Sequence, residues 1–169
     1  MKIARSIRSI ALVAAVCPAA TLGTAGAADL PKEGKYDYTA CYSGIVNVIA
    51  FSKTHRAFNY EFTGSSRSNL AGGIFDKTSF HCVGSAAEFD KKYSGMVTCQ
   101  ERDHNDDSLL THFLAGDDRK WTRQTIAGTG KYEGIVTNGT FELLGPFPIA
   151  KPGTFQNCSR QAGTYALKK

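Results

Sequence analysis

Apolar and polar residues alternate along short segments of the chain, and turn residues separate these segments. One segment shows the pattern clearly, because Phe58, Tyr60 and Phe62 alternate with the polar residues Asn59 and Glu61. A period of two places successive side chains on opposite faces of a β-strand. No segment keeps the 3.6-residue period of a long amphipathic helix. The pattern therefore predicts a chain built from β-strands.

Nine such segments can be placed, and turns rich in Gly, Asp, Lys and Pro separate them. We predict strands at residues 35–42, 45–52, 57–62, 78–84, 93–101, 109–115, 119–127, 135–143 and 162–167. The polar, glycine-rich segment 63–73 and the proline-containing segment 145–153 are predicted loops. Many short strands with frequent turns are typical of a sandwich or barrel. We predict an all-β fold: a single antiparallel β-barrel of about eight or nine strands, closed by pairing the first strand with the last.

Residues 1–27 have the composition of a signal peptide. A basic start with Lys2, Arg5 and Arg8 precedes a short apolar segment, and small residues at 25–27 form a cleavage site. The apolar segment is too short to span a bilayer. We therefore predict that the protein is cleaved after residue 27 and is periplasmic or secreted.

The remaining residues, 28–169, have the size of one domain and show no internal repeat or long linker. No apolar segment in this range is long enough for a membrane span. The full chain has a formal net charge of +5, but three of its cations lie in the predicted signal peptide. The rest carries 17 cations and 15 anions, a net charge of +2. Because acidic and basic residues are interleaved, we predict that nucleic acid is not a partner.

Four cysteines follow the predicted signal peptide: Cys41, Cys82, Cys99 and Cys158. An even number in an exported protein predicts two disulfides, and four cysteines allow three pairings. A tight hairpin turn at residues 90–91 would place Cys82 opposite Cys99, at the short Cβ separation that a disulfide requires. Pairing of the first strand with the last would bring Cys41 near Cys158. We predict the disulfides Cys82–Cys99 and Cys41–Cys158.

A glycine-rich turn joins two predicted strands in the segment AGTGKYEGI, residues 127–135. Gly128 and Gly130 lie at the reversal, and Gly134 ends a predicted single helical turn. Glycine accepts positive φ and close approach of the backbone, so we predict a structural role for these three residues. Lys131 is expected on the exposed side of this turn.

The same segment, together with the Gly-Thr-Phe run at 139–141, resembles the corner of barrels in the allene oxide cyclase and dirigent superfamily. The resemblance covers about a tenth of the chain. It implies a barrel fold. In that superfamily the barrel holds a hydrophobic substrate or radical product and steers its cyclisation or coupling. The resemblance thus implies a small hydrophobic molecule as partner, and it transfers no catalytic residue because no motif aligns one.

Aromatic and polar side chains on the predicted inner faces form a candidate ligand site. Trp121 and Arg123 share one face by the period of two. His112 shares a face with Leu110 and Leu114, which allows an inward orientation. A small barrel either holds one small ligand or is filled by side chains. The predicted ligand-binding residues are Tyr60, Phe62, His112, Trp121, Arg123 and Tyr132, with Glu61 as a further polar candidate.

Motifs of several enzyme classes are missing from the sequence. The G-x-S-x-G motif of serine hydrolases, the complete P-loop pattern and the H-E-x-x-H motif of zinc enzymes are not found. We predict no catalytic residue, no metal and no cofactor.

Three functions fit these predictions, and no oligomeric state is predicted. The first is non-catalytic binding of a small apolar ligand or a surface partner. The second is a cyclase or isomerase acting on a hydrophobic substrate in the barrel. The third is a filled barrel that interacts with proteins through its loops. A cavity of a few hundred Å³ would favour the first two, and a buried acid or histidine beside it would favour the second.

Overall fold

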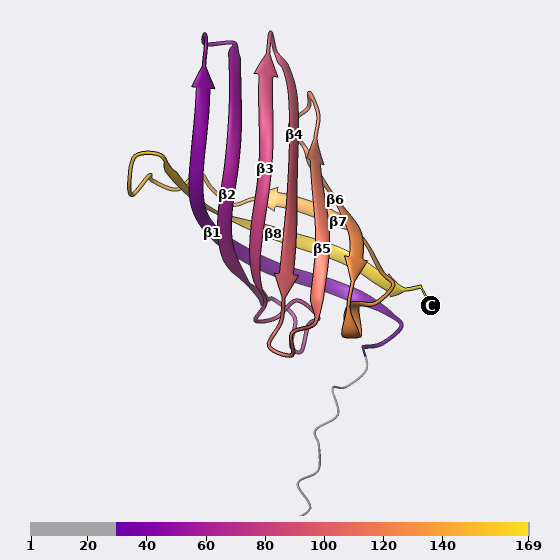
Figure 1. Cartoon of the computed structure of the whole chain (residues 1–169). Coiled ribbons are helices and arrows are strands. Elements are labelled where there is room, and N and C mark those ends of the chain that lie inside the picture. The colour runs from indigo at the N-terminus through magenta and orange to yellow at the C-terminus, as the bar shows by residue number, and fades with distance from the viewer. Residues whose placement is uncertain (1–29, 169) are drawn as a thin grey trace, which may run out of the picture.

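The structure is a computed structural model that describes residues 30–168. The predicted signal peptide at residues 1–27 lies outside the described residues. Eight strands follow one another along the chain, with one short 3₁₀ helix, η1, between the sixth and the seventh (Figure 1). They are β1 (Glu33–Ala50), β2 (His55–Ser68), β3 (Ser79–Phe89), β4 (Lys92–Arg102), β5 (Ser108–Ala115), β6 (Trp121–Gly128), η1 (Gly130–Tyr132), β7 (Ile135–Leu143) and β8 (Thr154–Leu167).

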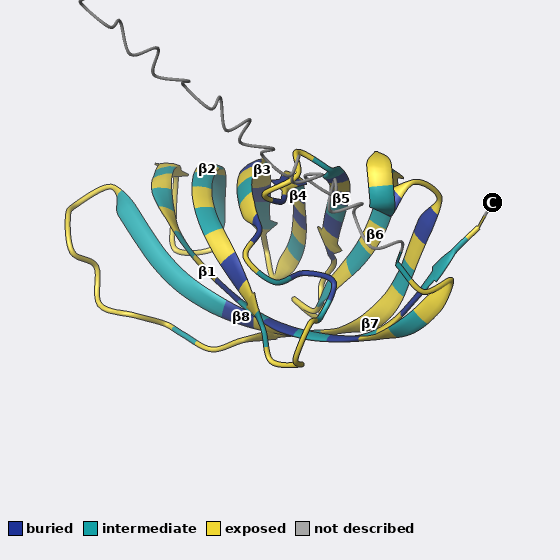
Figure 2. Cartoon of the chain, turned by 90° about the horizontal axis from the view of Figure 1, so that it is seen from below, coloured by how far each residue is buried: buried dark blue, intermediate teal, exposed yellow. Residues whose placement is uncertain are grey.

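All eight strands belong to one antiparallel sheet, in the order β6-β5-β4-β3-β2-β1-β8-β7. The first strand pairs with the last, as predicted, and the sheet curves into a nearly closed barrel (Figure 2). In the described part of the chain, β6 and β7 share no backbone ladder. The hydroxyl groups of Thr125 and Thr137 lie 2.8 Å apart across this seam. The predicted all-β barrel is confirmed, with one unsealed seam between β6 and β7.

Two predicted loops are instead parts of strands. The gap between the predicted strands 35–42 and 45–52 implies a turn at Ser43 and Gly44, but β1 continues through both residues as an 18-residue strand. Gly44 lies opposite Phe62, and a Cβ on Gly44 would collide with that residue. The glycine is therefore needed for close strand contact and not for a turn. The predicted loop at 63–73 is also shorter, since β2 extends to Ser68.

Both disulfides have the predicted pairing. Cys41 is directly opposite Cys158 in the β1–β8 ladder, and Cys82 is directly opposite Cys99 in the β3–β4 ladder. The Cα atoms are 4.1 Å apart in each pair. Cys82 and Cys99 are buried inside the barrel, whereas Cys41 is exposed on its outer face. Two disulfides are typical of a protein from an oxidising environment.

One end of the barrel is filled by a plug of apolar side chains. The loop between β2 and β3 folds back so that Phe75 packs parallel to Tyr132, with ring centroids 6.1 Å apart. The Tyr132 hydroxyl donates a hydrogen bond of 2.9 Å to the carbonyl of Ile74. The plug consists of Tyr36, Tyr38, Ala40, Ile74, Phe75, Leu109, Tyr132, Ile135 and Tyr165, all buried.

The glycine-rich turn lies beside this plug. Gly130 has φ +54°, and a Cβ there would also collide with the Asp107 carboxylate. Gly134 has φ +72°, which favours glycine as well. Gly128 has no positive φ, but it lies against the Tyr132 carbonyl with no room for a Cβ. The predicted structural role of these three glycines agrees with the geometry.

Lys131 is not on an exposed side of the turn, so that prediction is wrong. Its Nζ forms an ion pair with Oδ2 of Asp103, whose side chain is 1% exposed. Burial raises the pKa of Asp103, but Lys131 and the backbone N–H groups of Asn105 and Asp107 outweigh this effect and lower it. Lys131 thus compensates the charge of a buried carboxylate.

Candidate functional site

The half of the barrel opposite the plug contains a cavity of about 270 Å³. Side chains from all eight strands line it, and most are aromatic or aliphatic. The lining residues are Tyr38, Ala40, Tyr42, Tyr60, Phe62, Phe80, Cys82, Tyr93, Val97, Cys99, Glu101, Phe113, Trp121, Phe141, Leu143, Phe155, Asn157, Ser159 and Gln161.

The cavity has a mouth at the end where the hairpin turns lie. Tyr93 and Trp121 begin β4 and β6 just after their turns, and both side chains are partly exposed. The deep end lies against the plug, where Tyr38 is 2% and Gln161 5% exposed. Because the plug closes that end, a ligand would enter between the hairpin turns.

Aromatic rings form the walls of the cavity. The rings of Tyr42 and Phe62 lie 4.9 Å apart, and Phe155 meets Phe62 edge-on at 5.6 Å. Burial raises the pKa of Tyr42 to about 12. Burial also raises the pKa of Tyr60 to about 12, with a smaller contribution from the nearby Tyr93. A phenol with its ordinary pKa near 10 is already uncharged at neutral pH, and burial moves its ionisation further from that range, so the walls suit an uncharged apolar molecule.

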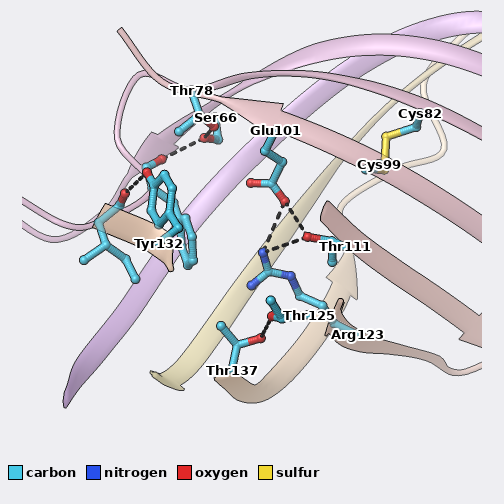
Figure 3. Close-up of polar contacts among 12 residues, drawn as sticks. Ser66, Thr78, Cys82, Cys99, Glu101, Thr111, Arg123, Thr125, Tyr132 and Thr137 are labelled. Carbon is cyan, nitrogen blue, oxygen red and sulfur yellow. Dashed lines mark hydrogen bonds and ion pairs between the residues drawn. A yellow bond between two sulfur atoms is a disulfide. The ribbon is translucent and has the colours of Figure 1, made fainter. Parts of the chain in front are cut away.

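The floor of the cavity is polar and contains a buried ion pair (Figure 3). Arg123 Nη2 lies 3.2 Å from Oε1 of Glu101, with side-chain exposures of 6% and 8%. The Thr111 hydroxyl donates to the same Glu101 oxygen at 3.3 Å. On the plug side, the Arg123 guanidinium lies over the Phe75 ring, 4.9 Å from its centroid. The ion pair thus lies at the boundary between the plug and the cavity.

Two further polar groups at the floor have unused hydrogen-bonding capacity. Ser159 Oγ and Gln161 Oε1 are buried and have no hydrogen-bond partner among residues 30–168. Both residues lie on β8 and line the cavity. Buried polar atoms are normally paired, so groups of this kind beside a cavity indicate a place for a polar ligand group.

A charged network at the mouth holds three hairpins together. Glu88 on β3 accepts hydrogen bonds from Arg56 on β2 and from Arg119 in the turn between β5 and β6. The hydrogen bond from Arg56 lowers the pKa of Glu88, although burial opposes the effect. The Arg119 guanidinium also lies over the ring of Tyr93, 4.8 Å from its centroid. These contacts fix the rim of the cavity.

The structure brings together only some of the predicted ligand residues. Tyr60, Phe62 and Trp121 line the cavity. Arg123 lies on the same inward face of β6 as Trp121, as predicted, and forms an ion pair with Glu101 at the cavity floor. Tyr132 lies in the plug. Whether any of them binds a ligand remains a prediction.

His112 and Glu61 lie on the outer face. On β5 the inward residues are Leu109, Thr111 and Phe113, all buried. His112 alternates with them, so the expected inward orientation is wrong. Glu61 also points outward, where its Oε1 lies 3.1 Å from Nε2 of His81.

The polar floor was not predicted from the sequence. Glu101 shares the period-two face of Cys99 and Val97, and this parity could have placed it inside the barrel. Ser159 and Gln161 come from a segment where no strand was predicted before residue 162, so no pattern indicated them.

Comparison with known proteins gives no matching family model, no matching curated protein and no matching solved structure. Within residues 30–168, no group of three or more His, Cys, Asp or Glu side chains is arranged to hold a metal ion. The same residues contain no helix long and apolar enough to cross a membrane.

Proposed function

We propose that this protein is an exported β-barrel that binds a small, largely apolar ligand inside the barrel. The observation that carries the proposal is the cavity of about 270 Å³ with aromatic walls. A protein cavity of about 150 Å³ holds benzene, and ligand pockets usually start near 300 Å³. The available space therefore suits a molecule about twice the size of benzene.

The proposed relation to the allene oxide cyclase and dirigent barrels rests on the corner at residues 127–135. An eight-stranded barrel with a hydrophobic cavity is compatible with such a relation. A shared fold does not fix the function, so the relation supports ligand binding only as an analogy.

A cyclase or isomerase is the second candidate, and Glu101 is the observation that favours it. It is a buried acid that lines the cavity, and a positioned carboxyl group can transfer protons to or from a bound substrate. Its Oε1 already accepts hydrogen bonds from Arg123 and Thr111, and this role as partner of a buried cation accounts for its position without catalysis. We therefore rank binding above catalysis. A filled barrel acting through its loops ranks third, because the cavity argues against it.

Native mass spectrometry of protein purified from its own source tests the proposal. We expect the intact protein to carry one additional small molecule. Val97 lines the cavity and is 8% exposed, so Val97→Phe should fill part of the space and remove the bound mass. Met96 is the neighbouring residue on the outer face, 47% exposed, and Met96→Phe should keep the ligand. A wild-type protein without bound mass, or equal binding by Val97→Phe, would contradict the proposal.

The same preparation separates binding from catalysis. Incubation of the released molecule with fresh protein should return it unchanged if the protein only binds it. Conversion into an isomer, detected by chromatography and lost in Glu101→Gln, would instead establish the second candidate.

Export is part of the proposal and has a separate test. N-terminal sequencing of the protein from its source should begin at Ala28. An intact Met1 would contradict export by signal-peptide cleavage.

A further inference from the structure

The polar groups at the floor of the cavity define which ligand end can be buried there. Within residues 30–168, Glu101 receives two hydrogen bonds, from Thr111 and Arg123, and both go to Oε1. The second carboxylate oxygen, Oε2, is left to accept a further hydrogen bond. A carboxylate accepts hydrogen bonds and donates none. The floor therefore offers an acceptor to whatever fills the cavity.

Gln161 and Ser159 add two more oxygen atoms in the same place. Gln161 is 5% and Ser159 1% exposed, and neither Oε1 nor Oγ has a partner in the described part of the chain. On the neighbouring strand β7, Phe141 lies opposite Gln161 and Leu143 lies opposite Ser159. A side-chain carbonyl only accepts, whereas the serine hydroxyl can accept or donate. Arg123 Nε and Nη1 are buried donors that also lack a partner among residues 30–168, but Arg123 does not line the cavity and its guanidinium lies over the Phe75 ring of the plug. Among the lining residues in this part of the chain, the buried unpaired atoms are the two oxygens of Ser159 and Gln161.

The charges at the floor are balanced. The negative charge of Glu101 is compensated by Arg123 at 3.2 Å. A carboxylate on the ligand would be placed beside the Glu101 carboxylate, and like charges in a buried site repel strongly. A cation would gain little, because the Glu101 charge is already paired. An uncharged donor meets neither problem.

We propose that the ligand is an uncharged apolar molecule with a hydrogen-bond donor at one end, a hydroxyl group or an amide N–H, and that this end lies against Glu101, Ser159 and Gln161. The inference rests on the proposed ligand-binding function and specifies its chemistry. A ligand without a donor would displace water from these oxygens and form no hydrogen bond with them, so it would bind more weakly. Sites built to hydrogen-bond a ligand group reject analogues that lack it.

Binding of matched probes tests the inference. Trp121 is the only tryptophan of the chain and lines the cavity, so its fluorescence reports occupancy. The probes are 1-octanol, its isomer 1-methoxyheptane, which has no donor, and octanoate at pH 7. All three are transparent where tryptophan absorbs. We expect 1-octanol to bind about tenfold more tightly than 1-methoxyheptane, which corresponds to one hydrogen bond, and octanoate to bind most weakly.

Three outcomes have different meanings. The expected order supports the inference. Equal affinities for the alcohol and the ether, or tightest binding of octanoate, would overturn it while leaving the ligand-binding function intact. If no probe changes the fluorescence of Trp121, the proposed function fails together with the inference.

Two variants locate the effect at the floor. In Gln161→Leu and in Ser159→Ala, the preference for 1-octanol over 1-methoxyheptane should fall toward equality. Ser85 is exposed on the outer face of β3, and Ser85→Ala serves as the matched control that keeps the tenfold preference. Ser159→Ala removes only one oxygen atom, so it remains testable if Gln161→Leu does not fold. An unchanged preference in Ser159→Ala and in any folded Gln161→Leu would contradict the assignment.

Discussion

Arg123 Nη2 lies 3.2 Å from Glu101 Oε1 at the boundary between the cavity and the plug, with both side chains almost fully buried. Taking two charges out of water is costly, and their attraction compensates this cost only while both are present. The stability of the fold should therefore depend strongly on keeping both residues of the pair.

Removing one partner should destabilise the protein strongly. We expect Arg123→Met to reduce the free energy of unfolding by about 3–5 kcal/mol, because Glu101 then stays buried without a partner. The double variant Glu101→Leu/Arg123→Met should recover most of that loss. Denaturant unfolding with intact disulfides measures both. A double variant that is less stable than Arg123→Met would contradict this account of the pair.

A surface ion pair should make the stability depend on pH in the acid range. Asp37 on β1 accepts hydrogen bonds from Arg160 on β8, at 3.0 and 2.6 Å, and from Asn69. The Arg160 and Asn69 hydrogen bonds lower the pKa of Asp37 from 3.8 to about 2. A lowered pKa in the folded state means that the contribution is fully present above about pH 4 and is lost as the pH falls toward 2.

Asp37→Asn isolates this contribution. The difference in unfolding free energy between wild type and Asp37→Asn should be constant from pH 5 to 8 and should shrink below pH 4. Denaturant titrations at a series of pH values measure it. The same difference at pH 2 as at pH 7 would show that the charge of Asp37 is not responsible.

The ion pair of Lys131 with Asp103 should stabilise the glycine-rich turn. Asp103 is almost fully buried, so Lys131→Ala leaves a buried carboxylate without its cation. We expect a loss of about 1–3 kcal/mol in unfolding free energy. Lys92 is exposed at the start of β4, and Lys92→Ala is the control with an expected change within about 0.5 kcal/mol. Equal effects of the two variants would mean that the Asp103 contact contributes nothing.

The two disulfides should differ in their accessibility to reductant. Cys41 is exposed on the outer face, whereas Cys82 and Cys99 are 1% and 5% exposed. Mild dithiothreitol treatment of the folded protein should therefore open Cys41–Cys158 first. Alkylation followed by peptide mass mapping identifies the freed cysteines. Simultaneous release of all four would contradict the difference in burial.

The sequence predicted those features that depend on local period or on strand pairing. The alternation of Phe58, Tyr60 and Phe62 places them on the inner side of β2. The hairpin turn between Phe89 and Lys92 sets the register that brings Cys82 opposite Cys99. These features follow from geometry that repeats every two residues.

The remaining features depend on contacts between distant segments. Both faces of β5 carry apolar residues, Leu110 and Leu114 outside and Leu109 and Phe113 inside, so alternation alone does not show which face is buried. Phe75 lies between the predicted loop at 63–73 and the predicted strand at 78–84, and it becomes part of the plug only because this segment folds into the barrel end. The parity of Glu101 with Cys99 indicates its inward side, but its ion pair depends on Arg123, which lies on another strand.

Binding of the fluorescent aromatic amine 1-aminonaphthalene, which is about twice the size of benzene, tests whether the barrel holds a ligand. Trp121 lines the cavity, so a probe bound inside should accept excitation energy from it at short range. We predict saturable energy transfer with one probe per chain, strongly reduced in Val97→Phe and retained in Met96→Phe. Absence of transfer in the wild-type protein, or equal transfer in Val97→Phe, would contradict a ligand-binding cavity inside the barrel.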